Sequence, residues 1–123
     1  MTSVQMFGLL PARLDLAVMQ GDGLAFVVGF YDGDDQPIDV SGWVAQAQSR
    51  RTPGGLLLAQ FDLTVGGGSL DSHEIQGELP AAVTWTIAGG SWPWDMVLKE
   101  GWPLPRTVLA GQLTILPRAT EVS

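Results

Sequence analysis

The sequence predicts an all-β protein, an immunoglobulin-like antiparallel β-sandwich of about seven strands with one short helical turn. Gly and Pro, with 16 and 8 copies among the 123 residues, punctuate the chain at short intervals. The turn signals that they give recur about every 8 to 12 residues, which is the spacing typical of sandwiches. Between the turns, apolar and polar residues alternate with the two-residue period of half-buried strands, and stripes with a helical period are scarce.

The chain divides into an N-terminal arm, residues 1–11, and a β-sandwich domain, residues 12–120. The arm is rich in apolar residues, has no charged side chain and shows no period that would place it under its own sheet. We therefore expect the arm to dock on a neighbouring subunit. Trp102 lies in a predicted turn, and an exposed Trp on a surface with few charges is typical of a protein contact. The predicted protein-contact residues are Val4, Met6, Phe7, Leu9, Leu10 and Trp102.

Two strands are predicted in the first third of the domain. Residues 13–18 alternate in polarity and follow Pro11, which blocks pairing on one side and favours an edge strand. Residues 24–31 place a large apolar side chain at every second position and are rich in β-forming residues, so we expect a central strand. Asp, Gly and Pro in residues 32–37 then predict a tight turn.

The middle of the chain continues the pattern. Residues 43–50 are predicted to form a strand in which small residues share a face with Trp43, and residues 56–65 to form one further strand. The glycine triplet at 66–68 is interpreted as a hairpin tip, because the lysine and helix of a phosphate loop do not follow it. Residues 73–79 give another short strand.

The predicted helical turn covers residues 80–87, with Pro80 at its first position and two glycines after its end. Residues 92–99 and 106–117 then form the last antiparallel pair. The inward residues of the second run are Leu109, Gly111, Leu113 and Ile115. The predicted core consists of Phe26, Val28, Phe30, Trp43, Trp94, Met96, Leu113 and Ile115.

The composition excludes several kinds of partner and site. With 6 basic and 13 acidic residues, the net charge of −7 opposes the counterion release on which nucleic-acid binding depends. Without Cys and with one His, the chain has no disulfide and no usual zinc ligand set. It contains no run of about 20 apolar residues and no signal-peptide pattern, so we expect no membrane span and assembly in the cytoplasm. Charged residues make up only 15% of the chain, which indicates a surface partly covered by neighbours.

No catalytic or cofactor site is predicted. The run Asp71-Ser72-His73-Glu74 contains the residue types of nucleophilic catalysis. Neighbours in a strand point to opposite faces, however, so Ser72 and His73 cannot face each other as a catalytic pair. We therefore expect the protein not to be an enzyme.

No metal site is predicted either. A calcium loop needs Gly at its sixth position and Glu at its twelfth, and counting from Asp32 these positions hold Pro37 and Trp43. We expect no tight calcium site at the acidic residues of this region, which are Asp32, Asp34, Asp35 and Asp39.

Trp residues suggest an alternative function. The chain has 5 Trp, and exposed indole rings would stack on sugar rings, as in a carbohydrate-binding module that holds host surface glycans. Trp92 and Trp94 alternate with other large apolar residues, which favours the core for these two. The protein-contact function and the glycan-binding alternative both stay open at this point.

Short structural motifs occur from about Leu14 to Thr120. They are Gln20-Gly21-Asp22, Phe30-Tyr31-Asp32, Pro37-Ile38-Asp39-Val40-Ser41-Gly42-Trp43, Ala47-Gln48-Ser49-Arg50, Trp94-Asp95-Met96-Val97-Leu98 and Leu109-Ala110-Gly111-Gln112-Leu113-Thr114-Ile115-Leu116-Pro117. Together they resemble the small all-β domains of tailed-phage and prophage tails, similar to the N-terminal domain of upper baseplate proteins. The resemblance implies an adaptor or minor tail protein that contacts other tail or baseplate proteins in a multi-copy assembly. We therefore expect a non-enzymatic virion structural protein, located in the tail and assembled in the host cytoplasm.

Overall fold

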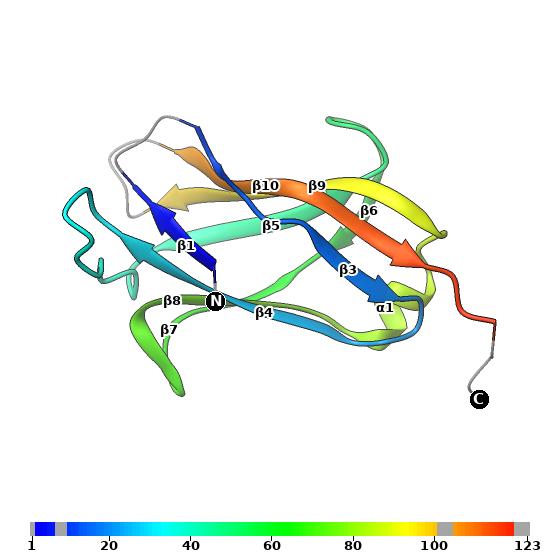
Figure 1. Cartoon of the computed structure of the whole chain (residues 1–123), viewed down its shortest axis with the longest axis horizontal. Helices are drawn as coiled ribbons and strands as arrows, with labels where there is room; N and C mark the ends of the chain where they lie inside the picture. The colour runs from blue at the N-terminus through cyan, green and yellow to red at the C-terminus, as the bar shows by residue number, and fades with distance from the viewer. Residues whose placement is uncertain (1, 7–9, 101–104, 120–123) are drawn as a thin grey trace.

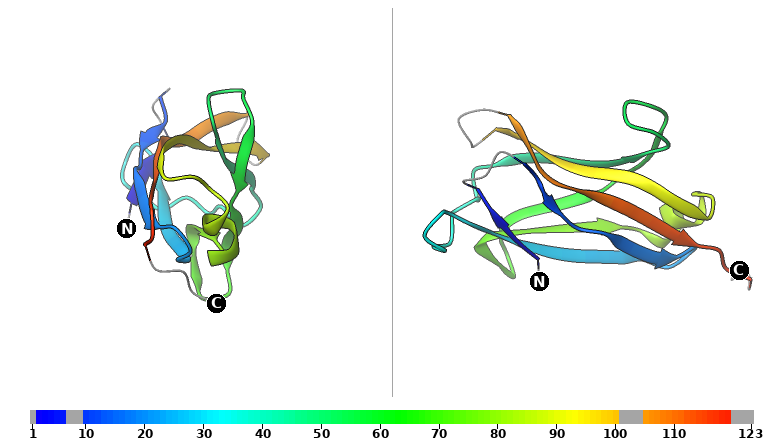
Figure 2. Two further views of the ribbon diagram at one scale, coloured as in Figure 1. Left: turned by 90° about the vertical axis from the view of Figure 1, so that its right-hand side faces the viewer. Right: turned by 45° about the horizontal axis from the view of Figure 1, so that its top comes forward.

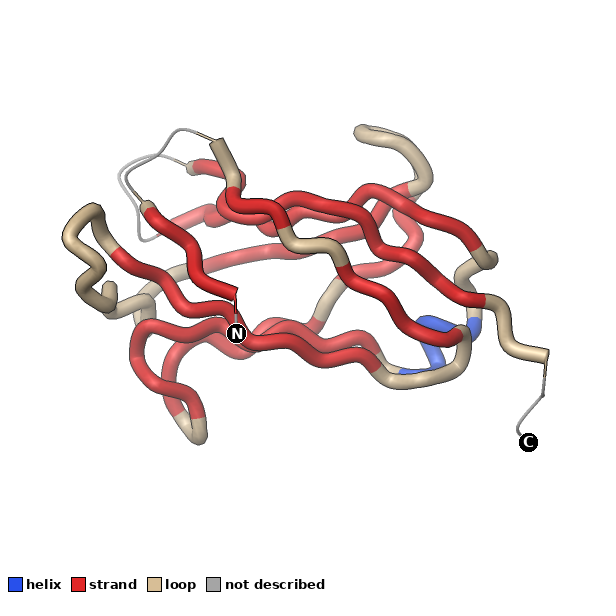
Figure 3. The backbone as a smooth tube through the Cα atoms, in the orientation of Figure 1, coloured by secondary structure: helices blue, strands red, loops and turns tan. Residues whose placement is uncertain are grey.

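The computed structural model describes residues 2–6, 10–100 and 105–119, and this part of the chain forms two sheets packed face to face (Figure 1, Figure 2). Its elements are β1 (Thr2–Gln5), β2 (Ala12–Arg13), β3 (Leu16–Met19), β4 (Leu24–Tyr31), β5 (Val44–Arg50), β6 (Leu57–Gln60), β7 (Asp62–Gly67), β8 (Leu70–Leu79), α1 (Ala81–Trp85), β9 (Gly90–Glu100) and β10 (Arg106–Leu116). Strands dominate the backbone trace, and the single described helix lies at one end of the sandwich (Figure 3). The predicted all-β sandwich is confirmed.

The two sheets differ in size. Within the described residues, one has four strands in the order β1-β4-β8-β7, and the other has six, with the order β2-β10-β9-β5-β6 and β3 also beside β10. Most neighbouring strands are antiparallel, including the predicted pair β9 and β10. The pairings of β1 with β4 and of β2 and β3 with β10 are parallel, so the predicted antiparallel arrangement does not hold for these pairs of strands.

The N-terminal segment differs most from its prediction. β1 pairs with β4 over four residues, from Thr2 opposite Val28 to Gln5 opposite Tyr31. Val4 and Met6 are only 1% and 2% exposed and belong to the core. The expectation of an arm that docks on a neighbouring subunit is therefore wrong for residues 2–6, which are part of the sandwich. One strand of four residues is too short to show a clear alternation, and its partner is distant in sequence.

The predicted edge strand at residues 13–18 is split into β2 and β3, which both lie on the free side of β10. The break is at Leu14 and Asp15: the Leu14 amide still donates to the Ala110 carbonyl of β10 at 3.1 Å, but two acceptors of these residues bind groups outside the regular backbone pairing. The Leu14 carbonyl accepts a hydrogen bond from Trp94 Nε1 at 2.9 Å, and Asp15 Oδ1 accepts one from the Gln112 amide at 3.0 Å. A Cβ at Gly111 would lie 2.1 Å from the Leu14 carbonyl oxygen, so this approach requires glycine.

The predicted strand at 56–65 is also two strands, and they belong to different sheets. Phe61 separates β6 from β7, and its amide donates to the Ala47 carbonyl at 2.9 Å. Its ring is buried between the sheets. The apolar alternation continues through Phe61 although the hydrogen-bond partners change there. The sequence therefore does not show that the chain passes from one sheet to the other at this residue.

The other predicted strands agree with the structure. β4 covers the predicted range of 24–31 and is an inner strand of its sheet. β8 is longer than the predicted 73–79, and the glycine triplet forms the β7–β8 tip with positive φ angles at all three glycines. The turn after β4 is closed by Asp32 Oδ1, which accepts hydrogen bonds from the amides of Asp34 and Gln36.

The single described helix agrees with the predicted helical turn. α1 follows Pro80, which is its N-cap rather than its first helical residue. The buried Thr84 holds the helix against the turn after β3, because its hydroxyl donates to the Asp22 carbonyl at 2.7 Å and accepts from the Gly21 amide at 3.1 Å.

The core lies between the sheets, and seven of the eight predicted core residues are buried. The eighth, Phe26, is partly buried and packs edge-on against Phe61 and Trp94. Val108, predicted to point outward, is buried together with its neighbour Leu109. A register shift between Thr107 and Leu109 makes this possible, because a β-bulge interrupts the strict two-residue alternation.

Candidate functional site

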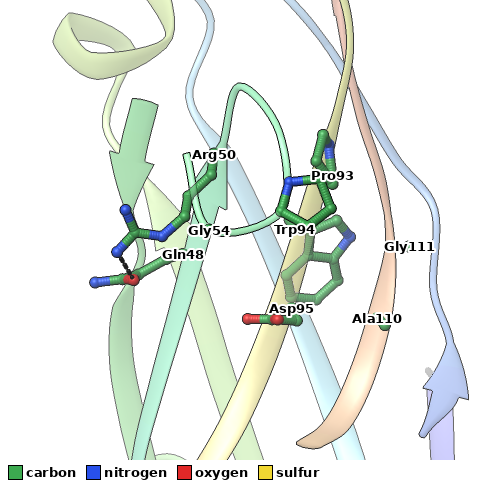
Figure 4. A pocket seen from close by; sticks show the side chains of 9 residues that line it. Gln48, Arg50, Gly54, Pro93, Trp94, Asp95, Ala110 and Gly111 are labelled. Carbon is green, nitrogen blue, oxygen red and sulfur yellow. Dashed lines mark hydrogen bonds between the residues drawn. The ribbon is translucent and has the colours of Figure 1, made fainter. Parts of the chain in front are cut away.

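A pocket of about 430 Å³ opens on the outer face of the six-stranded sheet, over β5, β9 and β10 (Figure 4). We call it the Asp95 pocket. It is lined by Gln48, Arg50, Pro53, Gly54, Pro93, Trp94, Asp95, Ala110 and Gly111.

Strand alternation and register place the polar residues of this pocket. On β5, Ala47 and Ser49 are buried, so Gln48 and Arg50 point outward. Gln48 pairs with Asp95 on β9, and Asp95 pairs with Ala110 on β10, which gives a row across three strands. The row is hollow over β10 because Ala110 has a small side chain and its neighbour Gly111 has none.

The loop between β5 and β6 forms one wall of the pocket. It turns through Pro53 and Gly54 and is closed by a hydrogen bond from the Gly55 amide to the Thr52 carbonyl. Arg50 links this loop to β5, since its Nη1 donates to the Gly55 carbonyl and its Nη2 donates to Gln48 Oε1, both at 2.8 Å. Figure 4 shows the guanidinium and the Gln48 amide on one side of the opening and Asp95 on the other.

Asp95 is the charged group without a close partner in this pocket. Its carboxylate makes no hydrogen bond or ion pair with any residue that the structure describes. Although the residue as a whole is exposed, burial of the carboxyl raises its pKa above the usual 3.8, and the charge of Arg50 opposes this shift. The carboxylate thus loses hydration without gaining a donor in return.

A second pocket, of about 410 Å³, lies on the other side of Ala110 and Gly111. It is lined in addition by Leu10, Pro11, Arg13 and Gln112. Arg13 is not free here, because it forms an exposed ion pair with Asp15 at 3.1 Å.

Asp15 gives a prediction on pH dependence. Its pKa lies below the usual 3.8, first because the Gln112 amide donates to it and next because Arg13 does. A lowered folded-state pKa means that the ionised group stabilises the fold above the unfolded pKa, and that this contribution is lost as the pH falls through the folded pKa. We expect Asp15→Asn to lower the free energy of unfolding at neutral pH and to have a smaller effect in acid. Urea unfolding of both proteins across this pH range measures the difference, and a pH-independent difference would contradict the assignment.

The predicted contact residues are not gathered in one place. Val4 and Met6 lie in the core and are not accessible to a partner in this conformation. Leu10 is 84% exposed at the second pocket. Phe7, Leu9 and Trp102 lie outside the described residues.

The Trp residues of the described chain do not form an exposed platform. Trp43 and Trp94 are buried, and Trp92 is partly buried with its indole N–H donating to the Ala88 carbonyl. Trp85 on α1 is 41% exposed. The hypothesis that exposed Trp side chains bind glycans therefore has little support in this part of the chain.

The run considered for catalysis lies at the start of β8. The ligand atoms of Asp71, His73 and Glu74 lie within 4.8 Å of one another. Two of these side chains already have partners inside the protein: Glu74 accepts from the Asp71 amide at 2.8 Å, and His73 Nε2 lies 3.3 Å from the Tyr31 hydroxyl. The group is explained as a local hydrogen-bonded cluster at the hairpin.

Sequence reasoning missed the Asp95 pocket. Its signal is the pair of small residues Ala110 and Gly111 in an otherwise bulky strand. These small residues indicate a pocket only when β10 is known to lie two strands from β5. The alternation of apolar and polar residues does not reveal the order of the strands.

Comparison with known proteins places the fold. No family model and no curated protein matches this chain. Among solved structures, the chain is similar to the N-terminal domain of phage TP901-1 ORF48, with a TM-score of 0.56 and 7% identity over 93% of this chain and 94% of that one. The similarity to the Listeria monocytogenes internalin-like protein lmo2027 is weaker, with a TM-score of 0.42 and 9% identity over 88% of this chain and 28% of that one. In the described residues no helix has the length and apolarity to cross a bilayer. The expected resemblance to a small all-β phage domain is thus confirmed at the level of the fold.

Proposed function

We propose that this protein is a non-enzymatic structural protein of a phage tail, an adaptor that works through contacts with other tail or baseplate proteins in multiple copies. The observation that supports this most is the fold shared with the phage TP901-1 domain along almost the full length of both chains. Fold alone does not fix function, so the surface has to agree with the proposal.

The surface of the described chain has several exposed apolar side chains that suit protein contacts. Leu10 lies at the second pocket, Leu57 begins the edge strand β6, and Leu56 directly precedes it. Met19 and Leu116 are both exposed and face each other across β3 and β10. Exposed apolar groups and an edge strand are features that proteins commonly cover with a neighbour.

Among the predicted contact residues, Leu10 is the best candidate for a tail contact, and Phe7, Leu9 and Trp102 remain predictions. Because the Leu10 side chain is almost fully exposed, its replacement should not disturb the fold. A central apolar contact in an interface is worth enough that its loss weakens binding about tenfold or more.

The test is incorporation into particles. Purified phage particles that encode this chain are analysed by mass spectrometry and by gold-labelled antibody in the electron microscope. We expect the wild-type protein at the tail, Leu10→Asp to reduce the particle-bound fraction about tenfold, and Thr64→Asp, an exposed change on β7, to leave it unchanged.

The two parts of the proposal fail separately. Absence of the wild-type protein from particles, although it is made in the cell, would contradict the tail assignment. Normal incorporation of Leu10→Asp would contradict only the contact role of Leu10.

A further inference from the structure

We propose that the Asp95 pocket binds one sugar unit of a carbohydrate, that is, a neutral ring with several adjacent hydroxyl groups. Sugar binding at this pocket is independent of the tail assignment and needs no exposed Trp side chain. It follows from the charges, the hydrogen-bonding groups and the walls of the pocket.

The charges of the pocket favour a neutral ligand. Arg50 and Asp95 line it with opposite signs, and they are not joined in an ion pair. A small anion would be attracted by Arg50 and repelled by Asp95, and a small cation would be attracted by Asp95 and repelled by Arg50. A neutral ligand that both donates and accepts hydrogen bonds can use both side chains.

The hydrogen-bonding groups are held ready for such a ligand. The Arg50 guanidinium is fixed by its bonds to the Gly55 carbonyl and to Gln48 Oε1, so little side-chain entropy is lost when a ligand binds. Gln48 Nε2 has only a long bond of 3.4 Å to Gln60 Oε1, which a ligand oxygen can replace. Adjacent hydroxyls therefore find donors on one side of the opening and an acceptor, Asp95, on the other.

The Asp95 carboxylate is the group in the pocket that most lacks a hydrogen-bond donor, which a ligand hydroxyl can supply. The carboxylate is partly desolvated and has no donor among the described residues. A raised folded-state pKa means that the ionised group costs stability at pH values above the unfolded pKa. Asp95→Asn should therefore fold at least as stably as the wild type, which makes it a clean test of binding.

The backbone of the pocket argues against an extended peptide as the ligand. β5, β9 and β10 each have a paired strand on both sides, so their amides and carbonyls are not free to add another strand. The walls contributed by Pro53 and Pro93 offer C–H surface on which the apolar face of a sugar ring can pack. The volume of about 430 Å³ lies in the range of small-ligand sites.

The experiment is a titration of the full chain, labelled with ¹⁵N, with methyl glycosides of glucose, galactose, N-acetylglucosamine and rhamnose up to tens of millimolar. We expect at least one sugar to give saturable amide shifts confined to residues near 48, 95 and 110 on β5, β9 and β10. Asp95→Asn and Arg50→Gln should each weaken this binding about tenfold or more, since a charged hydrogen-bonding partner is lost. Asp62→Asn, an exposed acid on the other sheet, is the matched control and should bind like the wild type.

Three results would overturn the proposal. The first is that no sugar shifts these amides, and the second is that the shifts lie elsewhere, for example around Trp85. The third is unchanged binding in both pocket variants. A blocked, uncharged tetrapeptide is titrated in parallel, and shifts at the pocket with the peptide but with no sugar would assign the pocket to a protein partner instead.

Discussion

Trp94→Ala is expected to lower the free energy of unfolding by about 3 to 5 kcal/mol, the usual cost of removing a large buried aromatic side chain. The ring is only 3% exposed and packs against both Phe26 and Phe61, at centroid distances of 5.4 and 5.2 Å. Its indole N–H also donates to the Leu14 carbonyl, which holds the break between β2 and β3 against the sheet. The substitution therefore leaves a cavity and an unsatisfied carbonyl together.

Urea unfolding measures this cost, and two variants separate its parts. Trp94→Phe keeps most of the ring but loses the donor, so it should cost roughly 1 to 3 kcal/mol. Trp85→Ala removes the same residue type from an exposed position on α1 and should cost less than either. A loss below about 1 kcal/mol for Trp94→Ala would show that the ring contributes little to the core.

Val4→Asp is expected to have an effect of similar size, because it places an unpaired charge in the core beneath β1. Val4 is opposite Phe30 in the parallel pairing with β4 and is almost fully buried. An uncompensated buried charge costs about 3 to 5 kcal/mol, unless β1 detaches and takes the charge into water. In that case the cost is the free energy that holds β1 to the sandwich.

The matched control for this change is Ser3→Asp, one residue earlier on the same strand and exposed. It adds the same charge but points away from the core, so the free energy of unfolding should stay within about 0.5 kcal/mol of the wild type. Equal, small effects of both substitutions in thermal or urea unfolding would mean that residues 2–6 behave as a free arm. The difference between them reports directly on whether the N-terminal strand belongs to the domain.

For two of the long strands, the sequence predicted which side chains face inward. In β4 and in residues 92–98 of β9 a large apolar side chain stands at every second position, and the structure buries five of these eight side chains and partly buries the other three. The turn after β4 was also predictable, because Asp32 closes it through bonds to amides two and four residues later. The turn depends on contacts between residues close in sequence, and the inward faces depend only on which side of each strand is buried.

The Asp95 pocket and the crossings between sheets were decided by the tertiary structure. Alternation tells which face of a strand is buried, but it does not tell which strand lies beside it. At Phe61 the chain passes from one sheet to the other, but the apolar alternation continues unchanged. β1 pairs with β4 in parallel, but it is too short to show an alternation.

The sequence by itself thus determined the fold class, most of the core and the position of the main turns, because the alternation of apolar residues and the residues that favour turns are visible within short stretches of chain. Only the tertiary structure placed Val4 and Met6 in the core and brought Arg50 and Asp95 around the small residues of β10. Those arrangements depend on strand order and register, which are fixed by the packing of segments far apart in the chain and therefore leave no pattern within any one of them.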